Sequence, residues 1–279
     1  MRTEISSLPR TKPPMSHAEF LALAVPLIVS TLSTPLLGAV DTAVVGQLPD
    51  PAYIGGVAVG SLIFNTLYWL LGFLRVSTSG FSAQAFGAND KSEVFMSLIR
   101  PLVLAVLFGL TFILFQNPIQ YPAMLLTDPT DNVKTFAAQY FDIRIWGAPF
   151  ALVNYAILGW LMGIARVRMA LFLQVFMNLL NIVLDIVFVA VFHMNIGGVA
   201  VASLIAEISA AVIGILIIVA DRQVKESCWS LSGAFPYAPL VNMLRVNRDL
   251  FIRTVCLLTV ITLFTAQGAA MGEVWLAAS

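Results

Sequence analysis

Four polar side chains follow one another at helical spacing in an otherwise apolar stretch of this sequence, residues 169–192. Gln174, Asn178, Asn181 and Asp185 are separated by four, three and four residues. In a helix this spacing places all four on one face. The amide of Asn181 and the carboxylate of Asp185 offer oxygen ligands to a small cation, and a carboxylate in an apolar cavity also readily takes up a proton. The same face also fits hydrogen bonding between helices without any role in transport.

A second acid, Asp41, lies deep in the apolar stretch 20–47. Gly38 shares its helical face, and Pro26 interrupts the backbone hydrogen bonding upstream, so the helix can bend there. An ionisable residue inside a membrane span is costly and marks an ion pathway or a charge pair by default. The other interpretation is an interfacial Asp41 that faces water, because Gln47 ends the stretch.

Another apolar stretch carries Tyr140, Arg144 and Asn154 on one helical face. Arg144 is a candidate counter-charge to one of the acids, and Tyr140 and Asn154 are candidate hydrogen-bond donors. A water-facing Arg144 near the outer end of its span fits the sequence equally well. Arg75 and Glu207 are two further ionisable residues within spans, and each suits either a transport pathway or a structural ion pair.

The overall composition requires a membrane environment for these groups. The chain has 279 residues, of which 59% are hydrophobic and only 11% are charged. Soluble domains carry about 25% charged residues, so this composition excludes a disordered chain, a nucleic-acid binder and almost any soluble enzyme. A helix needs about 20 apolar residues to cross a membrane. The sequence therefore predicts an all-α integral membrane protein with six spans and a partial seventh, at residues 20–47, 53–86, 98–117, 136–163, 169–192, 196–220 and 250–272.

Positive charge alternates between the connecting loops. Eleven Lys and Arg residues fall on one side, counting Arg100 at the start of the span 98–117 with the loop before it, whereas the loops on the other side hold only Lys134. The positive-inside rule then predicts a cytoplasmic N-terminus. We expect a cytoplasmic tail at 1–19, a six-helix bundle at 20–220, a cytoplasmic linker at 221–249 and the incomplete start of a second bundle at 250–279.

No catalytic arrangement occurs in the sequence. It contains no His/Cys cluster, no phosphate-binding glycine loop and no serine elbow. Cys228 and Cys256 are too few and too far apart for a disulfide framework. We therefore expect neither enzymatic activity nor a bound cofactor, and no fixed metal site.

Several short segments resemble the multidrug and toxic compound extrusion family, and within it the DinF-like branch. The resemblance runs from about residue 20 to the end of the chain, in the order and spacing of the segments. They are Val25–Pro26, VDTAVVG at Val40–Gly46, TSGFSAQAFGA at Thr78–Ala88, RIWGAP at Arg144–Pro149, NLLNIVLD at Asn178–Asp185 and IGGVAVA at Ile196–Ala202.

The resemblance implies a multi-pass antiporter of the bacterial inner membrane that exports lipophilic, often cationic, compounds in exchange for protons or sodium. It assigns the coupling cation to Asp41, Asn181 and Asp185, with Tyr140 nearby, and Na⁺ is an alternative to H⁺ at these residues. Some members have a threonine where this chain has Ala202, which favours protons. The driving force is a transmembrane ion gradient, and the partners are the substrates and the membrane lipids.

This resemblance suggests a mechanism. Protonation of Asp185 or Asp41 from outside neutralises the acid, allows the first span to bend at Pro26 and weakens substrate binding. Gln174, Asn178, Tyr140 and Asn154 form the supporting polar cavity in this hypothesis.

Two alternatives remain. One is a flippase for lipid-linked precursors from the same superfamily, and the other is an inactive membrane fragment. The family has two helical bundles, and this chain covers the first bundle and the start of the second. We therefore expect it to need a second copy of itself or a separate C-terminal half.

Overall fold

The computed structural model describes residues 36–127 and 130–220, together with residues 28, 32, 245, 248–253, 255, 256 and 260. Every element assigned in these ranges is a helix. In chain order they are the segment Leu36–Val45, α2 (Ala52–Leu70), α3 (Phe73–Gly87), α4 (Lys91–Leu114), α5 (Gln116–Thr127), α6 (Asp131–Arg144), the 3₁₀ turn Ile145–Gly147, α7 (Ala148–Gly163), α8 (Val167–Ile186), the π-helical turn Val187–Val191 and α9 (Asn195–Ala220).

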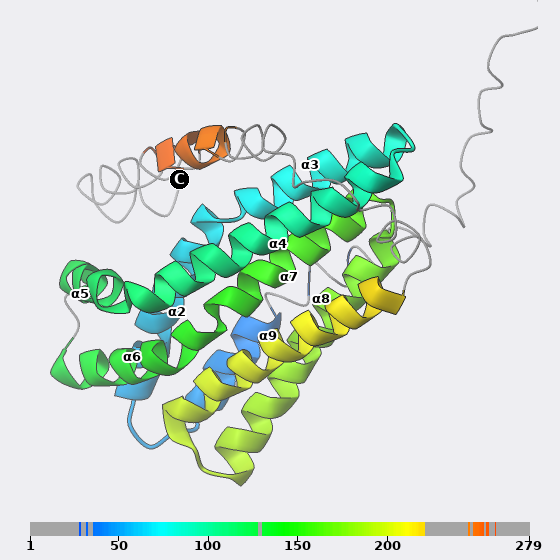
Figure 1. Ribbon diagram of the computed structural model, residues 1–279. Coiled ribbons are helices and arrows are strands. Elements are labelled where there is room, and N and C mark those ends of the chain that lie inside the picture. Colours follow the sequence, from blue (N-terminus) through cyan, green and yellow to red (C-terminus); the bar gives the residue numbers. More distant parts are fainter. Residues whose placement is uncertain are drawn as a thin grey trace, which may run out of the picture.

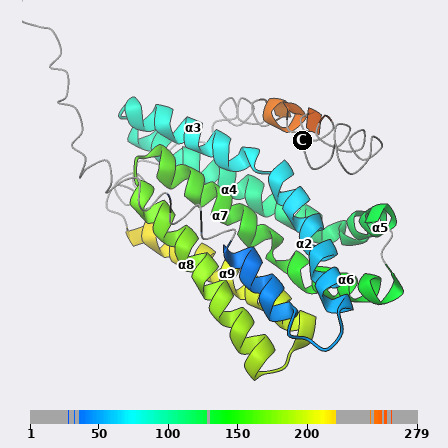
Figure 2. The ribbon, with the colours of Figure 1, turned by 180° about the vertical axis from the view of Figure 1, so that it is seen from behind.

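The helices form one bundle with long elements roughly side by side (Figure 1). Helix α7 packs against both α3 and α4, α8 pairs with α9, and α2 pairs with α6. The segment Leu36–Val45, dark blue in the reverse view, lies between α2 and α8 (Figure 2).

Five helical stretches are long and apolar enough to cross a membrane, which confirms the predicted all-α membrane fold. They are Ala52–Gly87, Lys91–Leu114, Asp131–Gly163, Val167–Val191 and Asn195–Ala220. Each coincides with a predicted span, although the observed helices begin up to seven residues earlier. The first predicted span is described only in part and the seventh only at scattered positions, so six spans plus a partial seventh remains a prediction. The predicted tail 1–19 and linker 221–249 lie largely outside the described residues.

The structure differs from the predicted spans at three places. The span expected to be continuous over 53–86 is interrupted by a turn between α2, which ends at Leu70, and α3, which begins at Phe73. The stretch expected to stop at Pro118 is followed by the additional helix α5. Pro118 is the third residue of that helix, where a missing backbone N–H breaks no intrahelical hydrogen bond. The span expected to be continuous over 136–163 is interrupted by the 3₁₀ turn Ile145–Gly147.

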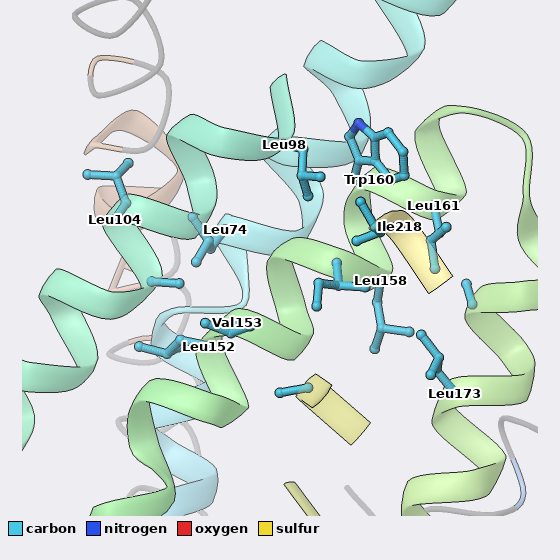
Figure 3. Close-up of a cluster of buried hydrophobic side chains, with 14 of the residues drawn as sticks. Leu74, Leu98, Leu104, Leu152, Val153, Leu158, Trp160, Leu161, Leu173 and Ile218 are labelled. Carbon is cyan, nitrogen blue, oxygen red and sulfur yellow. The ribbon is translucent and has the colours of Figure 1, made fainter. Parts of the chain in front are cut away.

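One end of the bundle is a dense apolar core, which we call the packed end. Its buried side chains come from α3, α4, α7, α8 and α9 (Figure 3). Trp160 is only 2% exposed, and its indole N–H donates a hydrogen bond to the Val94 carbonyl (2.8 Å). The hydroxyl of Ser97 donates to that of Ser82 (3.2 Å). These three side chains therefore have partners within the protein.

Glycines on α7 let the backbones of α3 and α7 come close together. A Cβ atom on Gly159 would lie 2.5 Å from the Arg75 carbonyl oxygen, and one on Gly163 would lie 2.6 Å from that of Ser79. Small residues at such positions are typical of packed membrane helices, because association there depends on close contact.

The other end of the bundle, which we call the cavity end, has a second apolar cluster. It joins the segment Leu36–Val45 to α2, α6, the start of α7 and the start of α9. This cluster surrounds the polar residues that the sequence indicates as candidates for function.

Candidate cation-coupling site

Helix α8 presents its polar face to the bundle interior. Asp185 is 0% exposed, Asn178 2% and Asn181 6%, and Gln174 is half-buried. Apolar side chains on other faces of the same helix, such as Phe172 and Leu179, are more than half exposed. A helix with this distribution faces lipid with its apolar side and places its polar side chains where other helices or a cavity receive them.

The two acids singled out in the sequence meet in the structure. Asp41 from the segment Leu36–Val45 and Asp185 from α8 lie close enough for their carboxyl groups to share a hydrogen bond. The described part of the chain supplies no hydrogen-bond donor to either oxygen of Asp185 or to Oδ1 of Asp41. Two facing carboxylates repel each other in an apolar surrounding, so a bound proton or cation stabilises the pair.

Asn181 adds a third oxygen beside this pair. Its side-chain amide donates a hydrogen bond to the Ser203 hydroxyl on α9 (3.1 Å), which leaves Oδ1 as a buried acceptor without a donor among the described residues. The buried oxygens without donors at Asp41, Asn181 and Asp185 form a set of hard oxygen ligands of the kind that bind small cations.

A cavity of about 370 Å³ opens beside these residues. Apolar residues of the segment Leu36–Val45 and of α2 form much of its wall. Its polar lining comes from five different elements and includes Asp41, Ser61, Tyr140, Arg144, Asn181 and Ser203.

Arg144 lines the same cavity as Asp41 and Asn181. It donates a hydrogen bond to Glu207 Oε1 on α9 (2.9 Å) and a longer one to the Tyr140 hydroxyl (3.4 Å). Its guanidinium also lies 5.4 Å from the centre of the Phe64 ring, within the range of a cation–π contact. Arg144 is within electrostatic range of both Asp41 and Asp185. The structure thus favours the counter-charge interpretation of Arg144 over a water-facing side chain.

The other predicted supporting residues fall into two groups. Tyr140 lies on the cavity, where its hydroxyl accepts a hydrogen bond from Ser61 (3.3 Å). Asn154 and Gln174 instead border a separate small void next to Met177. The Asn154 amide donates to the Glu207 backbone carbonyl (2.9 Å), so this residue holds α7 against α9 rather than facing the acids. Pro26, the proposed bend, lies outside the described residues.

Sequence reasoning missed two contributors on α9. The family resemblance points to position 202, where Ala202 is completely buried, whereas its neighbour Ser203 supplies the hydroxyl that accepts a hydrogen bond from the Asn181 amide. Glu207 was recognised only as an ionisable residue, yet it is the ion-pair partner of Arg144. Ser203 and Glu207 are four residues apart, so they share a helical face, and this spacing was a signal that could have linked them. Gly147 leaves room for Glu207, because a Cβ atom there would clash with Oε2.

Comparison with known proteins identifies the family of this site and fold. The model of the MatE family matches residues 26–187. The chain belongs to the MatE family. It is 38% identical to DNA damage-inducible protein F of Escherichia coli (strain K12) over 251 residues. This alignment covers 90% of this chain and 55% of the length of that protein.

A more distant relative shares sequence with this chain, and solved structures share its fold. Multidrug export protein MepA of Staphylococcus aureus (strain NCTC 8325 / PS 47) is 20% identical over 193 residues, covering 69% of this chain and 43% of MepA. The crystal structure described as MATE in the bent conformation superposes with a TM-score of 0.79 at 21% identity, covering 92% of this chain and 57% of that one. A MATE transporter in an outward-facing conformation gives 0.76 at 21% identity, with 88% and 54% covered.

This MatE protein is a multi-pass membrane protein of a transporter family, not of an enzyme family. It spans about half the length of the curated relatives it matches.

Proposed function

We propose that this MatE chain forms the cation-coupling bundle of a membrane exporter. The exporter moves lipophilic, cationic compounds out of the cell in exchange for protons or sodium ions. The observation that carries the proposal is the facing pair Asp41–Asp185, buried beside a cavity and without a hydrogen-bond donor among the described residues. The printed names of relatives, such as multidrug export protein, support the export of drugs.

The arrangement suggests how a cation is exchanged. With one proton on the pair, the two carboxyl groups share a hydrogen bond and repulsion is relieved. Without it, the pair is an anionic site to which Asn181 Oδ1 adds a third ligand, suited to Na⁺. Arg144 is itself paired with Glu207, so the Asp41–Asp185 pair depends on the cation that it binds for its charge balance.

Occupancy of the pair by a cation then controls the conformation of the helix that carries Asp41. Asp41 and Asp185 come from different helices, so their mutual repulsion acts to separate the segment Leu36–Val45 from α8. A bound proton or sodium ion draws them together. We propose that Pro26 provides the bend by which the first span responds, as the sequence indicates. A substrate with affinity for only one of the two arrangements is thereby coupled to the cation.

Exchange in proteoliposomes tests the proposal. The protein is reconstituted alone and together with a C-terminal half of a relative, and a pH-sensitive dye reports proton release after a lipophilic cation such as ethidium is added. We expect release that depends on the drug and disappears in the double variant Asp41→Asn, Asp185→Asn. Repeating the measurement with a sodium gradient distinguishes the two cations. Drug-dependent exchange that is unchanged in the double variant would contradict the proposal.

A further inference from the structure

A second cleft adjoins the cavity that contains Asp41, and we call it the aromatic cleft. Its volume is about 440 Å³, and its lining consists of Asn65, Thr66, Tyr68, Trp69 and Tyr155. Asn65 also lines the cavity. Because the exposed side chain of Asn65 belongs to both linings, the cavity and the aromatic cleft meet at this point of α2.

One face of α2 runs along both the cavity and the aromatic cleft. Its members, which are exposed or half-buried, are Ile54, Ala58, Ser61, Asn65 and Trp69. They are separated by four, three, four and four residues, so they share one side of the helix. The first four line the cavity, and the last two line the aromatic cleft. Eight residues of helix separate Ser61 from Trp69, which places these two levels about 12 Å apart.

Aromatic rings form a continuous wall beneath the shared residue. The Phe64 ring lies 6.4 Å from that of Tyr140 in the cavity lining and 5.8 Å from that of Tyr68 in the cleft lining. The rings of Tyr68 and Tyr155 meet edge to face, 6.3 Å between centres, and Trp69 is 45% exposed. Walls of this kind favour flat aromatic ligands, because rings pack on rings in offset or edge-on arrangements.

The cavity and the aromatic cleft differ in charge. Asp41 lines the cavity, and its Oδ1 is buried without a hydrogen-bond donor among the described residues. The other charged residue of the cavity lining, Arg144, is paired with Glu207. The five described residues that line the aromatic cleft include no acidic or basic side chain. A cationic group is therefore favoured in the cavity, and an uncharged aromatic group is favoured in the cleft.

We propose that the cavity and the aromatic cleft form one groove for an elongated ligand, with a cationic group at one end and a flat aromatic ring about 12 Å away at the other. The cationic group binds beside Asp41, the ring packs against Trp69 and Tyr155, and the connecting chain passes Asn65. The distance between the two groups determines selectivity, because a shorter ligand contacts only one end at a time. The cationic end of this inference rests on the proposed function, whereas the aromatic end does not.

A series of probes with different spacers tests this assignment. Each probe carries a 2-naphthyl group joined to a trimethylammonium group by two, seven or twelve methylene groups. Binding to the purified protein in neutral-lipid nanodiscs is measured by equilibrium dialysis, and binding to empty nanodiscs is subtracted. We expect the probe with seven methylene groups to bind at least about tenfold more tightly than the one with two, because it buries its ring in the cleft while its charge stays in the cavity. The probe with twelve should gain nothing further.

Competition shows whether the groove has two separate ends. Tetraethylammonium represents the cationic end of the ligand, and 2-naphthol represents the aromatic end. The probe with seven methylene groups should displace both compounds, because it occupies both ends. Neither small compound should displace the other.

Variants locate the two ends. Trp69→Ala should weaken binding of 2-naphthol and of the seven-methylene probe and leave tetraethylammonium unchanged, whereas Asp41→Asn should weaken tetraethylammonium and the probe and leave 2-naphthol unchanged. Asn65→Phe narrows the junction and should weaken the probe more than either small compound. Trp146→Ala is the matched control, because it removes an exposed tryptophan outside both linings, and it should change none of the three.

Equal affinity for the probes with two and seven methylene groups would overturn the inference, as would displacement of 2-naphthol by tetraethylammonium. An affinity for the seven-methylene probe that survives Trp69→Ala would also overturn it. If this probe binds as expected but drug-dependent exchange is absent, the proposed function alone is refuted. If exchange is intact but affinity does not depend on the spacer, the inference alone is refuted.

Discussion

The packed end and the cavity end of this bundle use their polar groups in different ways. At the packed end, the indole N–H of Trp160 and the hydroxyls of Ser82 and Ser97 have partners within the protein, and glycines bring α3 and α7 together. At the cavity end, Asp41 and Asp185 have buried oxygens without donors in the described chain, next to open space.

The contrast distinguishes polar groups that stabilise the fold through hydrogen bonds within the protein from polar groups that are available to bind a ligand. A satisfied buried group contributes to stability, whereas a buried carboxylate without a partner destabilises the protein until something binds it. Substitutions at the packed end should therefore reduce stability. Substitutions of the acids should reduce function without that cost.

The largest expected effect is on exchange, at the cavity end. The double variant Asp41→Asn, Asp185→Asn should abolish cation-coupled exchange, because the site then holds no exchangeable charge. The midpoint of thermal unfolding in detergent should stay the same or rise, since the two substitutions remove like-charge repulsion. Flux assays and thermal unfolding of the same preparations check both parts. A large loss of stability would mean that the acids are structural.

The Arg144–Glu207 pair tests whether every charge at the cavity end is kept for a ligand. Arg144→Gln leaves Glu207 buried without its counter-charge and should cost about 3–5 kcal/mol of unfolding free energy. The double variant Arg144→Gln, Glu207→Gln should recover most of that loss, because no unpaired charge remains. Denaturant unfolding of the three proteins measures the coupling. If the double variant is as unstable as the single one, the pair does not account for the loss.

A pair of glycine substitutions tests the α3–α7 contact at the packed end. Gly159→Ala places a Cβ atom against the Arg75 carbonyl and should cost about 1–3 kcal/mol, whereas nothing lies within 4 Å of the Cβ position at Gly80. Gly80→Ala is therefore the matched control and should be neutral or slightly stabilising, since alanine favours the helix. Equal effects on thermal unfolding at both sites would contradict the close approach of the two helices.

The smallest expected effect concerns one hydrogen bond. Trp160→Phe keeps most of the aromatic packing but removes the N–H that binds the Val94 carbonyl. We expect a loss of about 1–2 kcal/mol, from the hydrogen bond and the slightly smaller ring. Exchange should remain intact in this variant at temperatures where it is folded. A loss of exchange without a loss of stability would show that the two ends are not separable in this way.

Much of this arrangement follows from the sequence. The spacing of Asn178, Asn181 and Asp185 predicted a polar face on one helix, and the structure places those side chains inside the bundle. The helical spans were predictable because apolar length is a strong signal in membrane proteins. Helix α5 was not predictable in this way, because a proline such as Pro118 ends a helix at most positions but is tolerated in the first turn.

Contacts between helices that are far apart in the sequence were harder to predict than the helices themselves. Asp41 and Asp185 are far apart in the chain, so their proximity depends on how the segment Leu36–Val45 packs against α8. Arg144 had several acids as potential partners, and spacing along one helix does not select Glu207 on another. The 3₁₀ turn Ile145–Gly147 also shifts the helical phase between Arg144 and Asn154, so a face drawn across it does not persist.

The glycine contact between α3 and α7 has a mechanical consequence. Two helices whose backbones touch cannot slide past one another without steric overlap, so α3 and α7 should move as one rigid body. Whatever motion this protein makes must therefore be taken up elsewhere. We expect the elements around the cavity, above all the segment that carries Asp41, to move relative to the α3–α7 pair.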